Sequence, residues 1–121
     1  MQQDVIRVAR KIEECIQRLG SSENVIRDAA AARSVAVAEY DRDLGLTLVK
    51  LRNGATMDCD GEAIKDPPAS TSEKIAKAIC WESRLALEQA DAHYKVSMSK
   101  LDGIKAQLMG WQSVNKRLDN V

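Results

Sequence analysis

A group of basic side chains near the carboxyl end of the chain is the feature with the clearest chemical potential. Between Lys95 and Leu118 there are five basic side chains and one acidic one, Asp102, so the segment has a net charge of +4. Basic groups repeated along a helix can follow a chain of phosphates, although an ordinary solvated helix face has the same composition. The candidate nucleic-acid-binding residues are Lys95, Lys100, Lys105, Lys116 and Arg117.

Two other motifs resemble reactive sites but lack essential parts. The stretch Asp58-Cys59-Asp60-Gly61-Glu62 places carboxylates around a glycine, but it lacks the third acidic ligand and the distal glutamate of a calcium loop. His93 is the single histidine, and no serine or cysteine forms a nucleophile–base motif with it. The glycines match neither a P-loop nor a dinucleotide fingerprint. The sequence therefore predicts no enzyme activity, no metal site and no cofactor.

The overall composition restricts the partners and the compartment. Of 121 residues, 18 are basic and 18 are acidic, so the net charge gives no sign of a nucleic-acid or membrane partner. No run approaches the roughly 18 apolar residues of a membrane span, and the amino-terminal segment lacks the apolar core of a secretory signal. The three cysteines are irregularly spaced, which favours neither a disulfide framework nor a zinc site. We therefore expect a cytoplasmic protein without a membrane partner.

Helices must position the basic residues, because apolar residues recur at steps of three and four through most of the chain. The first predicted helix covers about residues 4–19 and ends at Gly20, where Ser21-Ser22 can begin the next one. The second predicted helix covers about residues 23–52. A rival interpretation of residues 46–55 is a short hairpin that turns at Asn53-Gly54.

The middle of the chain, residues 53–72, loses this periodicity and is predicted to be an acidic loop rich in Pro and Gly. Its length is unusual for a loop in a small domain, which indicates a mobile or functional segment. Ser70 and Glu73 have the spacing of a capping box, and a third helix is predicted over about residues 74–118. A helix of that length needs a partner to be stable in water.

These elements predict one all-α domain over residues 1–121. Its core is an antiparallel hairpin of two long helices, packed like a coiled coil, with a short amino-terminal helix at one end. We expect a homo-oligomer, because the apolar stripe of the third helix is too long to be covered by one hairpin. The residues expected in the oligomer seam are Leu101, Ile104, Leu108, Trp111 and Leu118.

Two segments of the last third of the chain, Ala90-Asp91-Ala92-His93-Tyr94-Lys95 and residues 108–118, resemble segments of small helical proteins of tailed phages. Some of these proteins are similar to the UvsY-type recombination mediators, which bind single-stranded DNA, assemble into rings and help to load a recombinase. The resemblance implies a non-enzymatic accessory protein of DNA recombination or replication in the host cell cytoplasm, with single-stranded DNA and a recombinase as partners. It makes the five basic residues named above the DNA-facing positions.

The acidic loop supports a second function from a different class. Its carboxylates, Asp58, Asp60, Glu62 and Asp66, can mimic phosphates toward a basic partner. On this interpretation the chain is a protein-binding module, such as an inhibitor of a host factor or a coiled-coil assembly adaptor. Salt-sensitive binding to single strands would favour the first function, and nuclease-resistant capture of one protein would favour the second.

Overall fold

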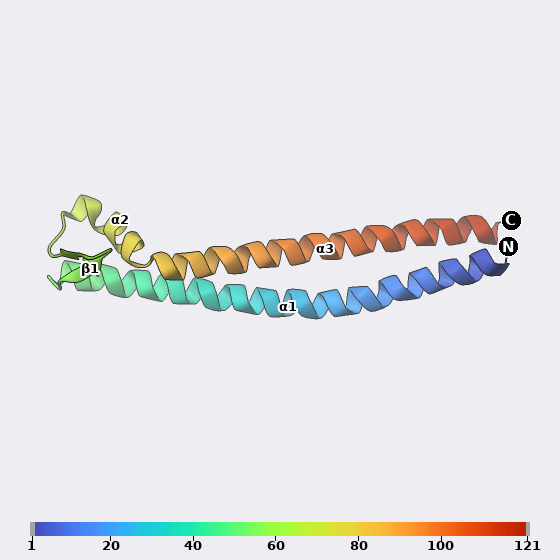
Figure 1. Cartoon of the computed structure of the whole chain (residues 1–121), viewed down its shortest axis with the longest axis horizontal. Helices are drawn as coiled ribbons and strands as arrows, with labels where there is room; N and C mark the ends of the chain where they lie inside the picture. The colour runs from blue at the N-terminus through green and yellow to red at the C-terminus, as the bar shows by residue number, and fades with distance from the viewer. Residues whose placement is uncertain (1, 121) are drawn as a thin grey trace. The chain divides into compact units, whose positions relative to one another are not determined.

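The computed structural model describes residues 2–120, and in this part of the chain it shows three helices and one two-stranded sheet. Helix α1 covers Gln2–Arg52, and helices α2 and α3 cover Ala69–Ile79 and Trp81–Asp119. Strands β1 (Met57–Cys59) and β2 (Glu62–Ile64) pair antiparallel between α1 and α2. The all-α class is therefore confirmed, with a small hairpin added to it (Figure 1).

The chain divides into two compact units, each of which contains part of both long helices. Unit 1 consists of Met1–Ala30 and His93–Val121, and unit 2 consists of Ala31–Ala92. Within each unit, α1 and α3 lie side by side and run in opposite directions (Figure 1). No helix in the described residues combines the length and apolarity that a membrane span would need.

The core of unit 1 is a narrow seam between α1 and α3. Alternating steps of four and three residues place the covered side chains on one side of each helix, as amphipathic helices require. On α1 they are Val8, Ile12, Cys15, Leu19, Ser22, Ile26 and Ala29. On α3 they are Tyr94, Ser97, Leu101, Ile104, Leu108, Trp111, Asn115 and Leu118. The two stripes face one another, which explains how so few aromatic residues suffice for a core.

The core of unit 2 includes the short elements as well as the two long helices. Buried side chains from α1 are Ala36, Tyr40, Thr47 and Leu51, and α2 adds Ser72 and Ala76. Helix α2 contacts strand β1, and the sheet pairs Met57 with Ile64. The sheet thus packs against α2 and does not form a separate layer.

The predicted break at Gly20 does not exist, because α1 continues without interruption through Ser21 and Ser22. The prediction of two helices over 4–19 and 23–52 is wrong for a physical reason. Ser22 occupies a covered position of the stripe, so continuing the helix keeps Ile26 on the side that packs against α3. That packing offsets the cost of about 1 kcal/mol for a helical glycine. The rival strand over residues 46–51 is also wrong, and α1 ends at Arg52 as predicted.

The predicted loop over residues 53–72 contains more structure than expected. Asp60 and Gly61 form a two-residue turn with φ of 52° and 85°, the left-handed pair that a type I′ hairpin requires. Helix α2 begins at Ala69, inside the predicted loop. Ser70 does not cap it, because the N-cap residue is Pro68, which has no side-chain cap bond.

The predicted third helix over 74–118 is divided at Cys80 into α2 and α3. Cys80 has φ −90° and ψ 23°, so the helix axis changes there although the backbone hydrogen bonds to Ala76 and from Arg84 persist. The Cys80 thiol is buried, and its Sγ lies 3.3 Å from Oγ1 of Thr47 on α1. The break therefore coincides with a contact between elements that are distant in sequence.

Candidate functional site

The residues predicted for the oligomer seam lie in the core of unit 1. Leu101 and Ile104 are buried within the single chain, and Leu108, Trp111 and Leu118 are half-buried. Because α1 of the same chain already covers Leu101 and Ile104, these two side chains are not available to a second copy. The structure thus places Leu101 and Ile104 in the seam between α1 and α3 of one chain, and a role of the five residues in an oligomer seam stays a prediction.

The five predicted nucleic-acid-binding residues are all exposed on the part of α3 that belongs to unit 1. Five residues of α-helix correspond to a rotation of about 140°, so Lys95, Lys100 and Lys105 point to three different sides. Lys105 and Lys116 are eleven residues apart and therefore lie within about 20° of one another. The helix thus forms no continuous row of lysines, although this one pair shares a side.

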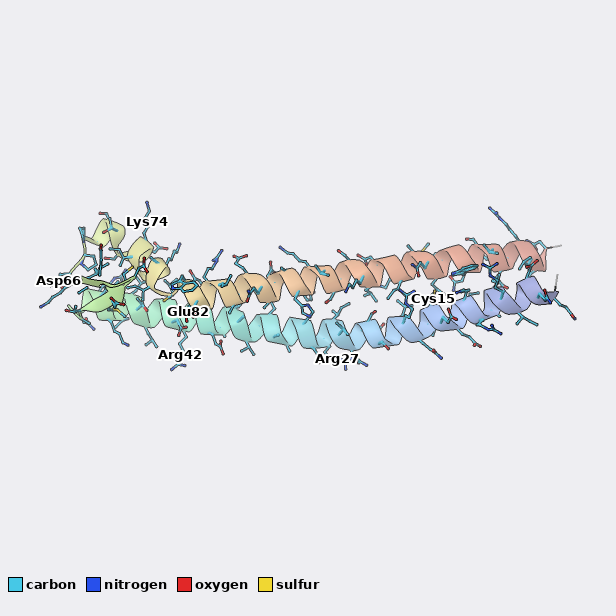
Figure 2. All side chains as sticks on the ribbon, viewed as in Figure 1. Cys15, Arg27, Arg42, Asp66, Lys74 and Glu82 are labelled. Atoms are coloured by element: carbon cyan, nitrogen blue, oxygen red, sulfur yellow. The ribbon has the colours of Figure 1, made fainter. Side chains whose placement is uncertain are left out.

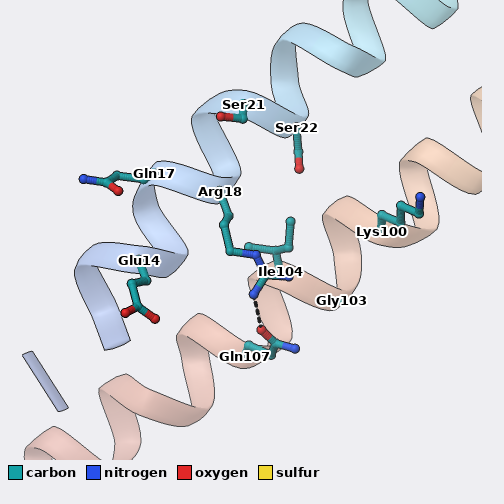
Figure 3. A pocket seen from close by; sticks show the side chains of 9 residues that line it. All are labelled: Glu14, Gln17, Arg18, Ser21, Ser22, Lys100, Gly103, Ile104 and Gln107. Atoms are coloured by element: carbon teal, nitrogen blue, oxygen red, sulfur yellow. Dashed lines mark hydrogen bonds between the residues drawn. The ribbon is translucent and has the colours of Figure 1, made fainter. Parts of the chain in front are cut away.

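A shallow groove of about 830 Å³ lies between α1 and α3 in unit 1, with Lys100 at its edge (Figure 3). The guanidinium of Arg18 donates a hydrogen bond from Nη1 to Oε1 of Gln107, at 2.9 Å, across the groove. The groove is open because the neighbouring residues Ser21, Ser22 and Gly103 are small. Its open lining combines polar side chains with apolar surface and can contact another molecule.

A smaller hollow of about 220 Å³ adjoins this groove and places His93 beside Val25 and Val96. His93 is exposed, and its carbonyl oxygen accepts a hydrogen bond of 2.9 Å from Oγ of Ser97. The histidine therefore lies at the edge of the seam. The exposed valines make this side of unit 1 partly apolar.

In unit 2, a series of polar side chains pairs across the seam between α1 and α3. Nε of Arg33 lies 2.7 Å from Oδ1 of Asp91. Oγ of Ser83 donates a hydrogen bond to Oδ2 of Asp43. These pairs occupy the same steps of three and four residues as the apolar seam residues, so they specify which turn of α1 faces which turn of α3. The spacing of apolar residues, on which the helix predictions depend, gives no signal for such pairs.

The head, defined as residues 57–84, contains the sheet, α2 and the first turn of α3, all in unit 2. A hollow of about 860 Å³ lies between the hairpin turn and the junction of α2 with α3. Trp81 lines this hollow with 58 % of its surface exposed. Asp58 and Asp60 of the hairpin line the same hollow, and both are exposed.

The head brings together part of the predicted acidic loop but forms no calcium loop. Residues 58–62 are the ends of two strands and their turn, which is a different geometry from a chain wrapped around an ion. Among the described residues, no three His, Cys, Asp or Glu side chains are grouped as a metal site needs. The exposed tryptophan at this position was not identified from the sequence, because the break at Cys80 that places it in the head has no local signal.

No family model, curated protein or solved structure matches the chain. The surfaces described above are therefore the basis for a functional assignment. They comprise an open groove in unit 1 and a head with an exposed tryptophan in unit 2, and both are suited to binding. The polar pairs between α1 and α3 in unit 2 bind each other and set the alignment of the two helices.

Proposed function

We propose that this chain is a non-enzymatic coiled-coil adaptor that binds a partner protein through its head. The alternating steps of three and four residues in both long helices support the coiled-coil assignment. The observation that carries the adaptor function is the exposed Trp81 beside the hollow of the head. A large aromatic side chain left in water at the edge of a hollow is typical of a protein interface.

The chemistry of the head indicates what kind of partner it binds. Trp81 offers an apolar face, which also attracts a cation placed over the ring. Asp58 and Asp60 also line the hollow and add negative charge. The matching partner is a protein segment with an apolar anchor residue next to lysine or arginine.

The substitution Trp81→Ala tests this function. A partner is first captured from nuclease-treated lysate with the full chain, then purified and titrated against each variant by calorimetry. We expect Trp81→Ala to weaken binding by at least about 30-fold, because an anchor tryptophan contributes about 2 kcal/mol or more. Leu85→Ala is the matched control, since Leu85 is also exposed on α3 but lies outside the hollow. Equal affinity of the Trp81→Ala variant and the unmodified chain would rule out the head as the contact surface.

Single-stranded DNA binding is a second candidate function, favoured by the charge of unit 1. This unit has ten basic and seven acidic side chains, a net charge of +3, whereas unit 2 has eight basic and eleven acidic ones. The resemblance to UvsY-type mediators concerns the same part of α3, and it would make a recombinase the further partner. Charge reversal at Lys105 and Lys116, which share one side of the helix, tests this candidate through salt-dependent binding.

For both candidates we propose the cytoplasm as the compartment. The free thiols of Cys15, Cys59 and Cys80 support a reducing environment. Cys15 and Cys80 are buried in the two seams, where they pack as small apolar residues. A phage origin, which the resemblance implies, would make this the cytoplasm of the host cell.

A further inference from the structure

The outward side of α1 in unit 2 carries a second regular line of side chains. It is separate from the covered stripe that packs against α3, and its members also follow steps of three and four residues. We call it the outer stripe: Ala32, Val35, Glu39, Arg42, Leu46 and Val49. All six side chains are exposed, including the three largest apolar ones, Val35 (57 %), Leu46 (47 %) and Val49 (54 %).

No described part of unit 2 covers the outer stripe. Figure 2 shows Arg42 pointing away from α3, on the side of α1 that faces solvent. No ion pair joins Glu39 or Arg42 to another described residue. The stripe therefore combines three unpartnered apolar side chains with one acid and one base that have no counter-ion among the described residues.

The outer stripe is complementary to itself when it is placed antiparallel to a second copy. About the midpoint between Tyr40 and Asp41, Val35 falls opposite Leu46 and Glu39 falls opposite Arg42. Ala32 likewise falls opposite Val49. A parallel arrangement in register would place Glu39 against Glu39 and Arg42 against Arg42, which is unfavourable. The order of charges thus selects one orientation and one register.

The residues beside the stripe allow a second helix to approach closely. Ala31, Ala38 and Gly45 follow one another at intervals of seven along the adjacent side of α1. A Cβ atom at Gly45 would meet nothing within 4 Å, so packing within the chain does not require a glycine there. A helix interior normally disfavours glycine by about 1 kcal/mol relative to alanine. A contact with another helix gives this small residue a role.

We propose that the outer stripe is the site at which a second copy of this chain binds, antiparallel and about a twofold axis. In such an isologous interface each copy contributes the same patch, so Val35 contacts Leu46 of the other copy and the reverse contact is made as well. Each interface also contains two Glu39–Arg42 pairs. The proposal is independent of the head and of nucleic acid, because none of the six residues belongs to those surfaces.

Charge reversal tests the twofold arrangement. The full chain is examined by sedimentation velocity over a wide range of concentrations, and we expect a monomer–dimer equilibrium. Glu39→Arg, or Arg42→Glu, places like charges opposite one another twice per interface, so the dissociation constant should rise at least about tenfold. The double variant, Glu39→Arg with Arg42→Glu, restores opposite charges and should return the dissociation constant to within about threefold of the original.

Asp41→Arg is the matched control, because it makes the same change of charge as Glu39→Arg on an exposed residue. Asp41 is the neighbour of Arg42 in sequence, but its side chain lies on another side of α1. We expect it to leave the dissociation constant nearly unchanged, and circular dichroism should show that every variant keeps its helices. The proposal is overturned if the chain stays monomeric at all concentrations. It is equally overturned if both single reversals leave the dimer intact, if Asp41→Arg weakens it as much as they do, or if the double variant fails to restore it.

Discussion

At the scale of single residues, the ion pair between Arg33 and Asp91 best explains how α1 and α3 are aligned in unit 2. Arg33 occupies a seam position of α1 where the neighbouring seam residues are Ala29 and Ala36. Asp91 is only 23 % exposed, so removal of its partner leaves a carboxylate partly shielded from water. Alanine seams discriminate poorly between registers, since one alanine fits another in any alignment. The charged pair supplies the missing specificity.

We predict that Arg33→Leu lowers the free energy of unfolding by about 1 kcal/mol, because Asp91 then loses a charged hydrogen-bond partner. Asp91→Leu should have a similar effect, because Arg33 then loses the carboxylate of Asp91 as a charged hydrogen-bond partner. The double variant should lose less than the sum of the two, with a coupling energy of about 1 kcal/mol measured by urea unfolding. Strictly additive losses would show that the pair contributes nothing to the seam.

The sequence allows some residues of the seam to be predicted but not the polar pairs. Val8, Ile12 and Cys15 are predictable because an amphipathic helix imposes regular spacing on its apolar residues. Arg33 and Asp91 are 58 residues apart, and only the alignment of two helices brings them together. Leu101 and Ile104 are correctly placed on the apolar stripe by their spacing, but spacing does not show that α1 of the same chain covers them.

At the scale of elements, the hairpin depends on the backbone of its two-residue turn. Gly61 has φ of 85°, and a Cβ atom there would meet nothing within 4 Å, so the conformation and not the space requires glycine. We predict that Gly61→Ala destabilises the hairpin by about 1 kcal/mol through left-handed strain. Amide hydrogen exchange should accelerate at residues 57–64.

Gly110→Ala is the control for this substitution. Gly110 lies inside α3, where a Cβ atom also meets nothing within 4 Å. The same chemical change should there stabilise the protein by about 1 kcal/mol, because alanine favours the helix. Effects of equal sign at the two positions would contradict the assignment of strain to the turn.

The elements show which sequence signals are reliable. The pair Asp60-Gly61 is a strong local signal for a type I′ hairpin, although the surrounding loss of periodicity predicts only a loop. Gly20 and Ser21-Ser22 instead predict a helix break that does not exist, because local capping preferences are weaker than packing along a continuous seam. The break at Cys80 is not predictable, since it has neither glycine nor proline and coincides with a contact to Thr47, 33 residues away.

At the scale of the whole molecule, a net charge of zero conceals a difference between the two units. The excess of basic side chains in unit 1 equals the excess of acidic side chains in unit 2. A partner that responds to total charge would therefore be neither attracted nor repelled at long range. A partner that contacts unit 1 alone would meet a positive surface, and salt should control the strength of that contact.

We predict, for the second candidate function, that the chain retains labelled single-stranded DNA at about 50 mM salt and releases most of it by about 200 mM, as proteins held by phosphate interactions do. The double variant Lys105→Glu with Lys116→Glu should bind more weakly. The slope of the logarithm of the binding constant against the logarithm of salt concentration should also become shallower, by about 0.7 for each phosphate that is no longer neutralised. Lys65→Glu with Lys74→Glu is the control, because it changes the net charge by the same amount in unit 2. Equally weakened binding in both double variants would indicate a response to total charge. If the unmodified chain retains no single-stranded DNA at low salt, the nucleic-acid function is eliminated and the adaptor function is left.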